Sequence, residues 1–312
     1  MQQLTSPALD EFAAAARHLN FAKAAAELGL HPSVFSRRIK DLERQLNVRL
    51  FDRDTRRVAL TDAGAVLLEH ARDIHTRLHD AATAIAALSS KPAGTLRLTV
   101  PVLFGQLHIA PLIPKFLARH PDLKLELTFS DKYEDLAQSG FDAAVRIGAL
   151  EAGGNLRVRK LAPNRRILCA SPAYLAAAGT PRHPSDLAQH RLLSFRPIAR
   201  QVWRLRSPGG VIDVAVDPVL TSDNMEPLRL AAVAGAGIAI VAVFGAAQDI
   251  AEGRLVTVLR DYQPLESTIS VVYRDAPHLP RRVRVLIDFL VEAFRGTPPW
   301  EVVRHKAGKK RR

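Results

Sequence analysis

The chain has 312 residues, of which 47% are hydrophobic and 24% are charged. This composition is ordinary for a globular protein, and the length is enough for two or three domains with sizeable cores. No run of about 18 apolar residues occurs, so we expect no transmembrane helix and no membrane partner. The N-terminal sequence lacks the basic-then-apolar pattern of a secretory signal, and the single cysteine, Cys169, suits a reducing compartment. We therefore expect a cytoplasmic protein.

The formal net charge of +13 at pH 7 is spread along the chain and is not concentrated in one domain. Residues 1–90 contain 12 basic and 11 acidic side chains, but within them residues 37–57 contain eight basic and four acidic ones. The local charge pattern, more than the bulk charge, therefore favours a nucleic-acid partner. Residues 298–312 contain six basic residues and one acidic residue, and we expect a disordered tail there. Such a tail either adds weak, salt-sensitive affinity for DNA or serves solubility alone.

Residues 21–46 have the pattern of two short helices joined by a tight turn. The small residues Ala24–Ala26 let a second helix approach closely, and Gly29 supplies the turn. The second helix is expected over residues 32–46, with Pro32 at its first position. Its apolar side chains are spaced four, three and four residues apart, which predicts one stripe facing a core: Phe35, Ile39, Leu42 and Leu46.

The opposite face of this second helix carries hydroxyl and basic groups. They are Ser33, Arg37, Lys40 and Arg44, with Ser36 beside them. Such a face behind a tight turn fits the major groove of DNA, where side chains near the helix N-terminus reach base edges and the others contact phosphates. The alternative is an ordinary amphipathic hairpin of helices with a solvated basic face.

Residues 50–60 extend the pattern with a short two-stranded wing. Leu50 and Phe51 can pack on the helices, and a polar turn separates them from the apolar residues 58–60. The wing carries Arg53, Arg56 and Arg57, which are suited to contact phosphate or the minor groove. The wing favours the DNA-binding interpretation over the plain hairpin.

With the wing included, residues 21–64 resemble the DNA-binding domain of LysR-type transcriptional regulators. The match runs through Phe21, Ala24, Ala25, Leu28, Val34, Ser36, Arg37, Ile39, Leu42, Glu43, Leu50, Phe51, Arg53, Leu60, Thr61 and Gly64. The chain has His31-Pro32-Ser33 where the family usually has Ser-Gln-Pro, so a base-reading glutamine is missing. Asn20 replaces the usual serine before the first helix of the motif and is an equally good N-cap. The resemblance implies an all-α winged helix-turn-helix domain over residues 1–61. In such a domain we expect Arg37 to be the main reader of bases or phosphates, with Ser33, Ser36 and Lys40 beside it.

Residues 62–90 are expected to form a long linker helix that begins after Thr61 as N-cap. Its apolar positions alternate spacings of four and three, as in a coiled coil: Leu67, Ala71, Ile74, Leu78, Ala81, Ile85 and Leu88. A seam this narrow needs a partner helix, and a second copy of the chain is the simplest one. His75 and His79 are four residues apart on this helix, but no cysteine or carboxylate completes a metal site, so we expect no metal.

Residues 91–297 alternate strand patterns with helix patterns, which predicts βαβ units and a mainly parallel sheet. The pattern repeats in a second half, so we expect two lobes, with lobe I formed by residues 91–163 and 265–297 and lobe II by residues 164–264. The resemblance extends here, through FDAAVRIG at 141–148 and GAGIAI at 235–240. It implies an α/β effector-binding domain similar to periplasmic binding proteins.

A ligand cleft between the lobes should be lined by residues that follow the strands, because ligands of open α/β sheets bind at the carboxyl ends of strands. This rule selects Val102, Leu103, Arg146, Phe195, Arg196, Ser222, Asp223 and Phe244, with Phe244 at the end of a strand. Arg146 and Arg196 favour a small organic anion. For Arg146 the alternative is a structural ion pair, and for Asp223 a plain helix N-cap is the favoured interpretation.

Three functions are compatible with this organisation. The favoured one is a transcriptional regulator that binds double-stranded DNA, forms dimers or tetramers through residues 62–90 and the effector domain, responds to a small-molecule effector and uses no cofactor. RNA polymerase is a further candidate partner. A non-sensing architectural DNA binder would have no use for the second domain. An enzyme is disfavoured because no nucleotide-binding phosphate loop, serine-nucleophile elbow or zinc-protease motif occurs, and Gly235-Ala236-Gly237 precedes a strand instead of following one.

Overall fold

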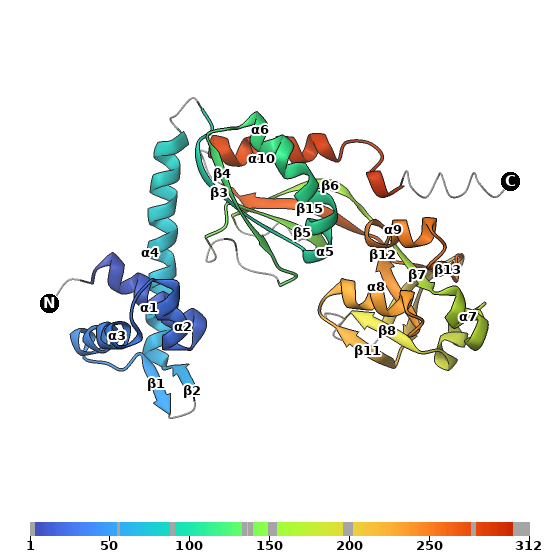
Figure 1. Ribbon diagram of the computed structural model, residues 1–312, viewed down its shortest axis with the longest axis horizontal. Helices are drawn as coiled ribbons and strands as arrows, with labels where there is room; N and C mark the ends of the chain where they lie inside the picture. Colours follow the sequence, from blue (N-terminus) through green and yellow to red (C-terminus); the bar gives the residue numbers. More distant parts are fainter. Residues whose placement is uncertain are drawn as a thin grey trace. The chain divides into compact units, whose positions relative to one another are not determined.

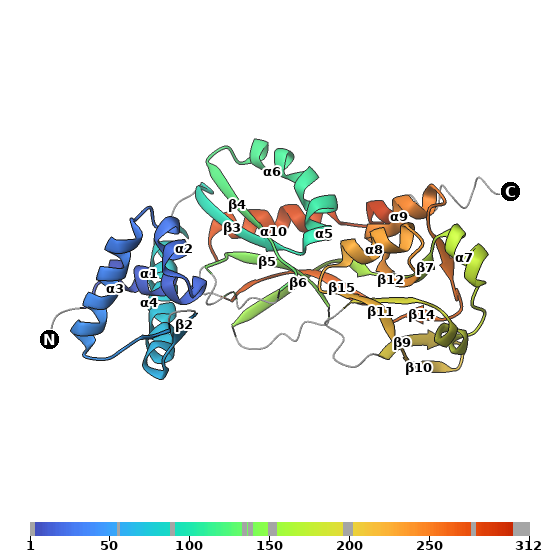
Figure 2. The same cartoon turned by 60° about the horizontal axis from the view of Figure 1, so that its bottom comes forward.

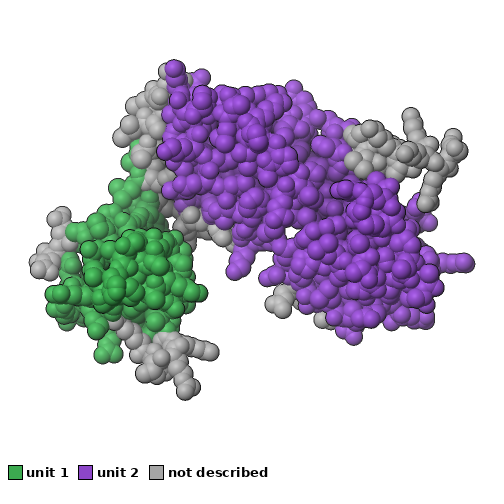
Figure 3. Space-filling view, viewed as in Figure 1, with its two compact units in different colours: residues 1–85 green, residues 86–312 purple. Residues whose placement is uncertain are grey.

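The chain folds into two compact units, residues 1–85 and residues 86–312 (Figure 3). The computed structural model describes residues 4–54, 57–87, 91–132, 136, 140–148, 155–195, 202–275 and 279–301. Among them, no helix is both long enough and apolar enough to cross a membrane.

The first unit begins with three helices and a wing, followed by a long helix (Figure 1). Their bounds are α1 (Ser6–His18), α2 (Phe21–Glu27), α3 (Pro32–Leu46), β1 (Phe51–Asp54), β2 (Arg57–Leu60) and α4 (Asp62–Ala87). Asn20 caps α2, because its side-chain oxygen accepts a hydrogen bond of 3.0 Å from the Lys23 N–H. Gly29 takes a φ of +65° in the turn before α3, a conformation that glycine adopts without strain. Both positions are as the sequence predicts.

Aromatic rings hold the first unit together. Phe21 contacts both Phe35 and Phe51 edge-on, at centroid distances of 5.9 and 5.4 Å, and Phe12 lies 5.5 Å from Phe51. The predicted stripe on α3 is confirmed, since Phe35, Ile39 and Leu42 are buried in this core and Leu46 packs at its edge. Burial of each such side chain contributes on the order of 2 kcal/mol.

The wing is fastened to the helices by polar contacts at its base. The Glu43 carboxylate accepts hydrogen bonds from the backbone N–H groups of Leu50 and Phe51, at 3.0 and 3.1 Å. Thr61 donates its hydroxyl proton to the Arg49 carbonyl at 2.7 Å and accepts from the Gly64 N–H at 3.0 Å. Thr61 therefore caps α4 as predicted. Together these hydrogen bonds hold the two ends of the wing, before β1 and after β2, against the helices.

Helix α4 leaves the core of the first unit after about three turns. Ala71 is fully buried, whereas the next seam positions, Ile74 and Leu78, are 41% and 53% exposed. His75 pairs with Asp10 on α1 at 3.2 Å. The predicted helix is confirmed over Asp62–Ala87, and its seam is exposed at Ile74 and Leu78. The side chain of Ile85, and Leu88 with the rest of residues 88–90, fall outside the described part of the chain.

Lobe I of the second unit contains a five-stranded sheet in the order β4-β3-β5-β15-β6 (Figures 1 and 2). Its strands are β3 (Gly94–Val100), β4 (Leu123–Phe129), β5 (Ala143–Gly148), β6 (Leu156–Asn164) and β15 (Ser267–Arg274). A helical stretch begins at α5 (Val102–Phe104) and continues to α6 (Ile113–Arg119). Helix α6 packs beside α10 (Arg281–Ala293), where the rings of Phe116 and Phe289 lie 5.2 Å apart.

Lobe II contains a five-stranded sheet in the order β11-β8-β12-β7-β13 and a three-stranded sheet in the order β10-β9-β14. The strands are β7 (Arg166–Ala170), β8 (Leu192–Phe195), β9 (Val202–Ser207), β10 (Gly210–Ala215), β11 (Pro218–Ser222), β12 (Ile238–Ala242), β13 (Val256–Val258) and β14 (Gln263–Pro264). The helices are α7 (Pro172–Ala178), α8 (Met225–Val233) and α9 (Val243–Ala251).

The expectation of mainly parallel sheets is confirmed for the main sheet of each lobe, in which four of the five strands run in the same direction and one is reversed. In lobe I, β3 runs parallel to β4 and β5, but β15 runs antiparallel to β5 and β6. In lobe II, β8 runs parallel to β11 and β12, but β7 runs antiparallel to β12 and β13. The reversed strands are β7 and β15, each of which directly follows a crossover between the lobes.

The two crossover segments between the lobes are linked residue by residue. The Asn164 side-chain amide donates to the Ser267 hydroxyl at 2.8 Å, Arg165 pairs with Glu266 at 3.6 Å, and the Arg166 guanidinium donates to the Leu265 carbonyl at 3.1 Å. Desolvation of the Arg166 side chain lowers its pKa from the ordinary value. The three contacts make one double-stranded hinge.

The expectation of a strand ending at Val243 and Phe244 is wrong in part, because β12 ends at Ala242 and these two residues begin α9. Helix α9 packs on α5, and a Cβ added at Gly245 would lie 2.8 Å from Leu103 Cδ2. The expectation of a disordered tail over residues 298–312 is wrong for residues 298–301, because Trp300 is only 2% exposed and belongs to the main core, and residues 302–312 fall outside the described residues. Both differences concern contacts between the lobes.

Candidate DNA-binding and effector-binding sites

The exposed face of α3 presents the groups that the sequence selects. Ser33, Arg37 and Lys40 are exposed and Ser36 is half-buried. Among the described residues, neither Arg37 nor Lys40 has a carboxylate partner, so both charges are available to another molecule. Sequence reasoning missed the role of His31, whose ring Nδ1 lies 2.8 Å from the Ser33 hydroxyl and accepts from the Ser33 N–H at 3.4 Å. His31 caps α3 and positions its first hydroxyl.

Two other arginines of α3 are engaged within the protein. Arg38 forms an ion pair with Glu11 of α1, which is nearly buried. Arg44 pairs with Asp41 one turn earlier on the same helix. Arg37 and Lys40 are therefore the basic groups of α3 that remain unpaired within the described chain.

For the wing arginines Arg53 and Arg57, the structure gives the backbone position in the strands. Arg53 lies on β1 opposite Val58, and Arg57 lies on β2 opposite Asp54. Arg56 falls outside the described residues.

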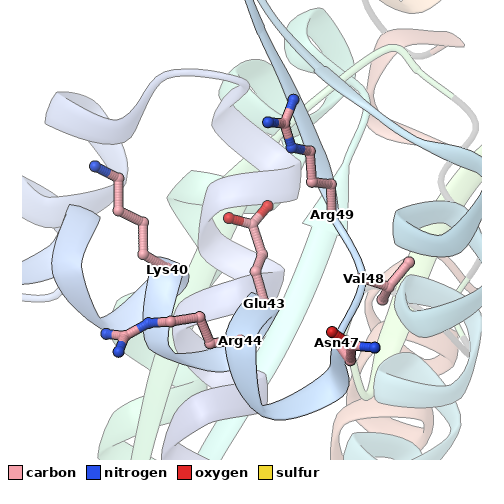
Figure 4. A pocket seen from close by; sticks show the side chains of 6 residues that line it. All are labelled: Lys40, Glu43, Arg44, Asn47, Val48 and Arg49. Carbon is pink, nitrogen blue, oxygen red and sulfur yellow. The ribbon is translucent and has the colours of Figure 1, made fainter.

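A hollow of about 430 Å³ lies between the C-terminal half of α3 and the segment that leads to β1. It is lined by Lys40, Glu43, Arg44, Asn47, Val48 and Arg49. Figure 4 shows Lys40 and Arg49 rising from its two sides, with Glu43 between them. Lys40 and Arg49 thus give the hollow two cations, while the Glu43 carboxylate is held in place by hydrogen bonds from the wing amides. Sequence reasoning did not select Arg49; its position directly before the apolar Leu50-Phe51 pair was the available signal.

In the effector domain, the structure brings three of the predicted residues near one carboxylate. The Asp131 carboxylate accepts from the Val102 N–H at 3.0 Å. The pKa of Asp131 is raised from its ordinary value, chiefly by burial and further by the negative charge of Asp223. The hydrogen bond from the Val102 N–H and the positive charge of Arg146 act in the opposite direction. Arg146 and Asp223 therefore lie within electrostatic range of Asp131, and they come from different lobes. Asp131 itself was missed by sequence reasoning.

Arg146 and Asp223 differ in their surroundings. Arg146 is buried on β5 opposite the buried Ser270, and its guanidinium donates to the Val145 carbonyl at 3.1 Å. Asp223 is exposed between β11 and α8. The interpretation of Asp223 as a helix N-cap is wrong, because Asn224 caps α8 by accepting from the Glu226 N–H at 2.8 Å. The Asp223 carboxylate is thus available to a ligand.

The remaining predicted effector residues lie elsewhere. Leu103 and Phe244 are both buried in the core that joins the lobes, and Phe195 packs partly against that core. The Ser222 hydroxyl accepts from the Asn224 N–H at 3.1 Å. Arg196 falls outside the described residues.

The described residues offer little for metal or thiol chemistry. No group of three or more metal-binding side chains occurs among them. Cys169 is fully buried, and burial raises the pKa of its thiol to about 12, with the nearby charge of Asp249 acting in the same direction. Its side chain is a core group in its protonated form.

Comparison with known proteins gives consistent matches to both units. The family model "LysR substrate binding domain" matches residues 89–295, and "Bacterial regulatory helix-turn-helix protein, lysR family" matches residues 8–65. The regulator DmlR of Escherichia coli K12 is 35% identical over 286 residues, covering 91% of this chain and 92% of DmlR.

Two solved full-length regulators have a similar structure. The virulence activator AphB of Vibrio cholerae has a TM-score of 0.69 and 26% identity, over 93% of this chain and 99% of AphB. CrgA of Neisseria meningitidis has a TM-score of 0.61 and 32% identity, over 94% of this chain and all of CrgA (100%). Both cover the two units described above.

Proposed function

This chain belongs to the LysR family of bacterial transcriptional regulators, and we propose that it reads its operator through Arg37 of α3 and holds its effector beside Asp131. It is a DNA-binding regulator modulated by an effector, and it is not an enzyme. Regulators of this family bind DNA and effectors and form oligomers. Its site of action is then the cytoplasm, where the DNA lies.

The observation that carries the DNA-binding proposal is the difference among the basic residues of α3. Arg38 and Arg44 are held by carboxylates of the same chain, whereas Arg37 and Lys40 extend into solvent. Arg37 can bind a base edge with two parallel hydrogen bonds. Ser33, Ser36 and Lys40 lie beside it, and Arg53, Arg56 and Arg57 of the wing would contact phosphate.

The proposal is tested by fluorescence-anisotropy binding to the DNA directly upstream of the protein's own gene, in the presence of excess random duplex. Arg37→Ala should reduce the preference for that DNA over random duplex, lowering the difference in binding free energy by about 1–3 kcal/mol. Arg72→Ala, which removes an exposed arginine from α4, is the matched control. Equal preference in the two variants would show that Arg37 does not read sequence.

For the effector we propose a small organic acid that also carries a hydrogen-bond donor. Arg146 supplies a positive charge for the acid, and the carboxylates of Asp131 and Asp223, which act electrostatically on the same place, would accept from a hydroxyl or ammonium group. A hydroxy acid should therefore bind more tightly than the analogue that lacks the hydroxyl.

Calorimetric titration with pairs of hydroxy acids and their deoxy analogues tests this proposal. Asp223→Ala should abolish the preference for the hydroxyl, whereas Asp217→Ala, which removes another exposed carboxylate of lobe II, should preserve it. Tight binding of an uncharged compound by both wild type and Arg146→Ala would contradict the acid. Equal binding of both members of each pair would contradict the donor.

The oligomer follows from the exposed seam of α4. Ile74 and Leu78 are apolar and exposed, and a second α4 would cover them. We propose a dimer joined through residues 62–90, which presents two α3 helices to half-sites about one helical turn apart. Contacts between effector domains would assemble two dimers into a tetramer, and RNA polymerase would be a further partner at the promoter.

A further inference from the structure

The matched family domain ends at residue 295, but the ordered chain continues with a short segment, residues 298–301. Its central residue, Trp300, is 2% exposed. A tryptophan buries about 150–250 Å² on packing, so this one side chain is a large part of the local core. The segment is therefore part of the hydrophobic core of the second unit.

The rings around Trp300 come from both lobes. In lobe I its indole lies 4.5 Å from the His108 ring and 5.8 Å from Phe104, and in lobe II it lies 6.0 Å from Phe244. The lobes also meet directly there, since His108 Nε2 lies 3.1 Å from the Phe244 carbonyl oxygen. Trp300 is therefore seated in the junction between the helical stretch after β3 and α9.

The neighbouring residue, Glu301, reaches the hinge. Its carboxylate pairs with the Arg165 guanidinium at 2.8 Å, and its side chain is 13% exposed. The Arg165 carbonyl accepts from the Val243 N–H, the first amide of α9, at 2.9 Å. One short segment thus contacts lobe I, lobe II and the first crossover.

We infer that residues 298–301 form an interlobe latch, which fixes the resting separation of the lobes by clamping α5 and α9 and bracing the hinge at Arg165. The lobes can then rotate against each other only as far as Trp300 keeps its contacts with His108, Phe104 and Phe244. The latch itself is inferred from these contacts alone. Its consequence, that it sets how far the effector cleft beside Asp131 opens, rests on the proposed function.

The latch acts between lobes, so its loss should loosen their arrangement while each lobe keeps its own sheet. Spin labels at Ala118→Cys on α6 and Ala177→Cys on α7 would report the distance between the lobes in the full-length protein, since both positions are exposed. Cys169 is buried and its pKa is raised to about 12, so it stays unlabelled. Dilution with excess unlabelled protein leaves at most one labelled chain in each oligomer.

We expect a narrow distance distribution for the otherwise wild-type chain and a broader one, shifted to longer distances, for Trp300→Ala. Trp300→Phe should lie close to wild type, because a smaller ring still fills most of the junction. Deletion of residues 302–312 should change nothing, since it spares the latch. An unchanged distribution in a folded Trp300→Ala variant would overturn the inference.

A second variant covers the case in which Trp300→Ala fails to fold. Glu301→Gln removes the ion pair with Arg165 and leaves the indole in place. Faster hydrogen exchange at the Val243 amide would support the latch, and an unchanged rate would contradict bracing of the hinge. Operator binding by these variants, compared with Arg37→Ala, separates a failure of the latch from a failure of the proposed DNA-binding function.

Discussion

Gly64 in the first turn of α4 lies directly against the carbonyl oxygen of Leu50, so that a Cβ at residue 64 would be 2.2 Å from that oxygen. No side chain fits at this distance unless the backbone moves. Because Leu50 begins the segment that becomes β1, the glycine sets how closely the long helix and the wing approach each other. Thr61 closes the same contact by bonding to both Arg49 and Gly64.

Gly64→Ala should therefore destabilise the DNA-binding domain by about 1–3 kcal/mol, the usual cost of overpacking. The loss is measurable as a lower midpoint of the first unit's unfolding transition in urea. Gly209→Ala, in a turn with open space around its Cα, should have almost no effect. Similar midpoints for Gly64→Ala and wild type would mean that the wing can shift freely against α4.

Arg49 of the hollow beside α3 should contact phosphate and not bases. Arg49→Ala should weaken binding to operator and random duplex by the same factor, and should reduce the slope of log affinity against log salt by about one unit. Anisotropy titrations at several salt concentrations measure both quantities, with Arg72→Ala as the control. A loss confined to the operator would instead assign Arg49 to sequence reading.

The exposed seam of α4 should govern self-association. Leu78→Asp places a charge in the seam and should shift the protein toward monomers in sedimentation velocity. Val66→Asp is a close control, because Val66 is also apolar and 57% exposed but lies off the seam. Association that survives Leu78→Asp at all concentrations would place the main contact in the effector domains.

The His108 ring predicts a pH dependence of stability in the effector domain. Burial lowers its pKa from the ordinary 6.5, against a smaller opposing effect of the hydrogen bond with Phe244. Above pH 6.5 the ring is neutral in folded and unfolded chains, so it has no cost. As the pH falls below 6.5 the unfolded chain binds the proton first, and stability is lost down to the folded pKa.

His108→Asn removes this titration while keeping a donor for the Phe244 carbonyl. The variant should lose less stability than wild type between pH 7 and about pH 5, as measured by urea unfolding of the second unit. His70→Asn, at an exposed position on α4, should follow the wild-type curve. Parallel curves for His108→Asn and wild type would assign the acid sensitivity to other groups.

The features that are predicted best are those that depend on the spacing and type of residues within one helix. The stripe on α3 and the cap at Asn20 follow from spacing and residue type, and both are confirmed. The start of α9 could not be predicted, because residues 238–244 are one apolar run and such a run does not separate a strand from a buried helix. Strand direction also leaves no trace in the pattern, so the one reversed strand of each main sheet, β7 and β15, was missed.

The candidate sites divide in the same way. Arg37 and Lys40 were predictable because one face of one helix decides their exposure. Asp131 was not, because its importance depends on Asp223 and Arg146, residues about 92 and 15 positions away that only the folded chain brings near. Trp300 was missed because it lies between two prolines and a basic run, a context typical of a disordered tail.

The place of β15 between β5 and β6 also determines the order in which the domain can be completed during synthesis. Strand β6 leaves the ribosome before lobe II, yet its partner in the sheet, β15, is made after lobe II. Lobe II is one continuous segment, so its sheets can close while β6 still lacks a neighbour. Chains truncated before residue 267 and released should therefore carry a finished lobe II beside an unpaired β6, the form most exposed to chaperones and to aggregation.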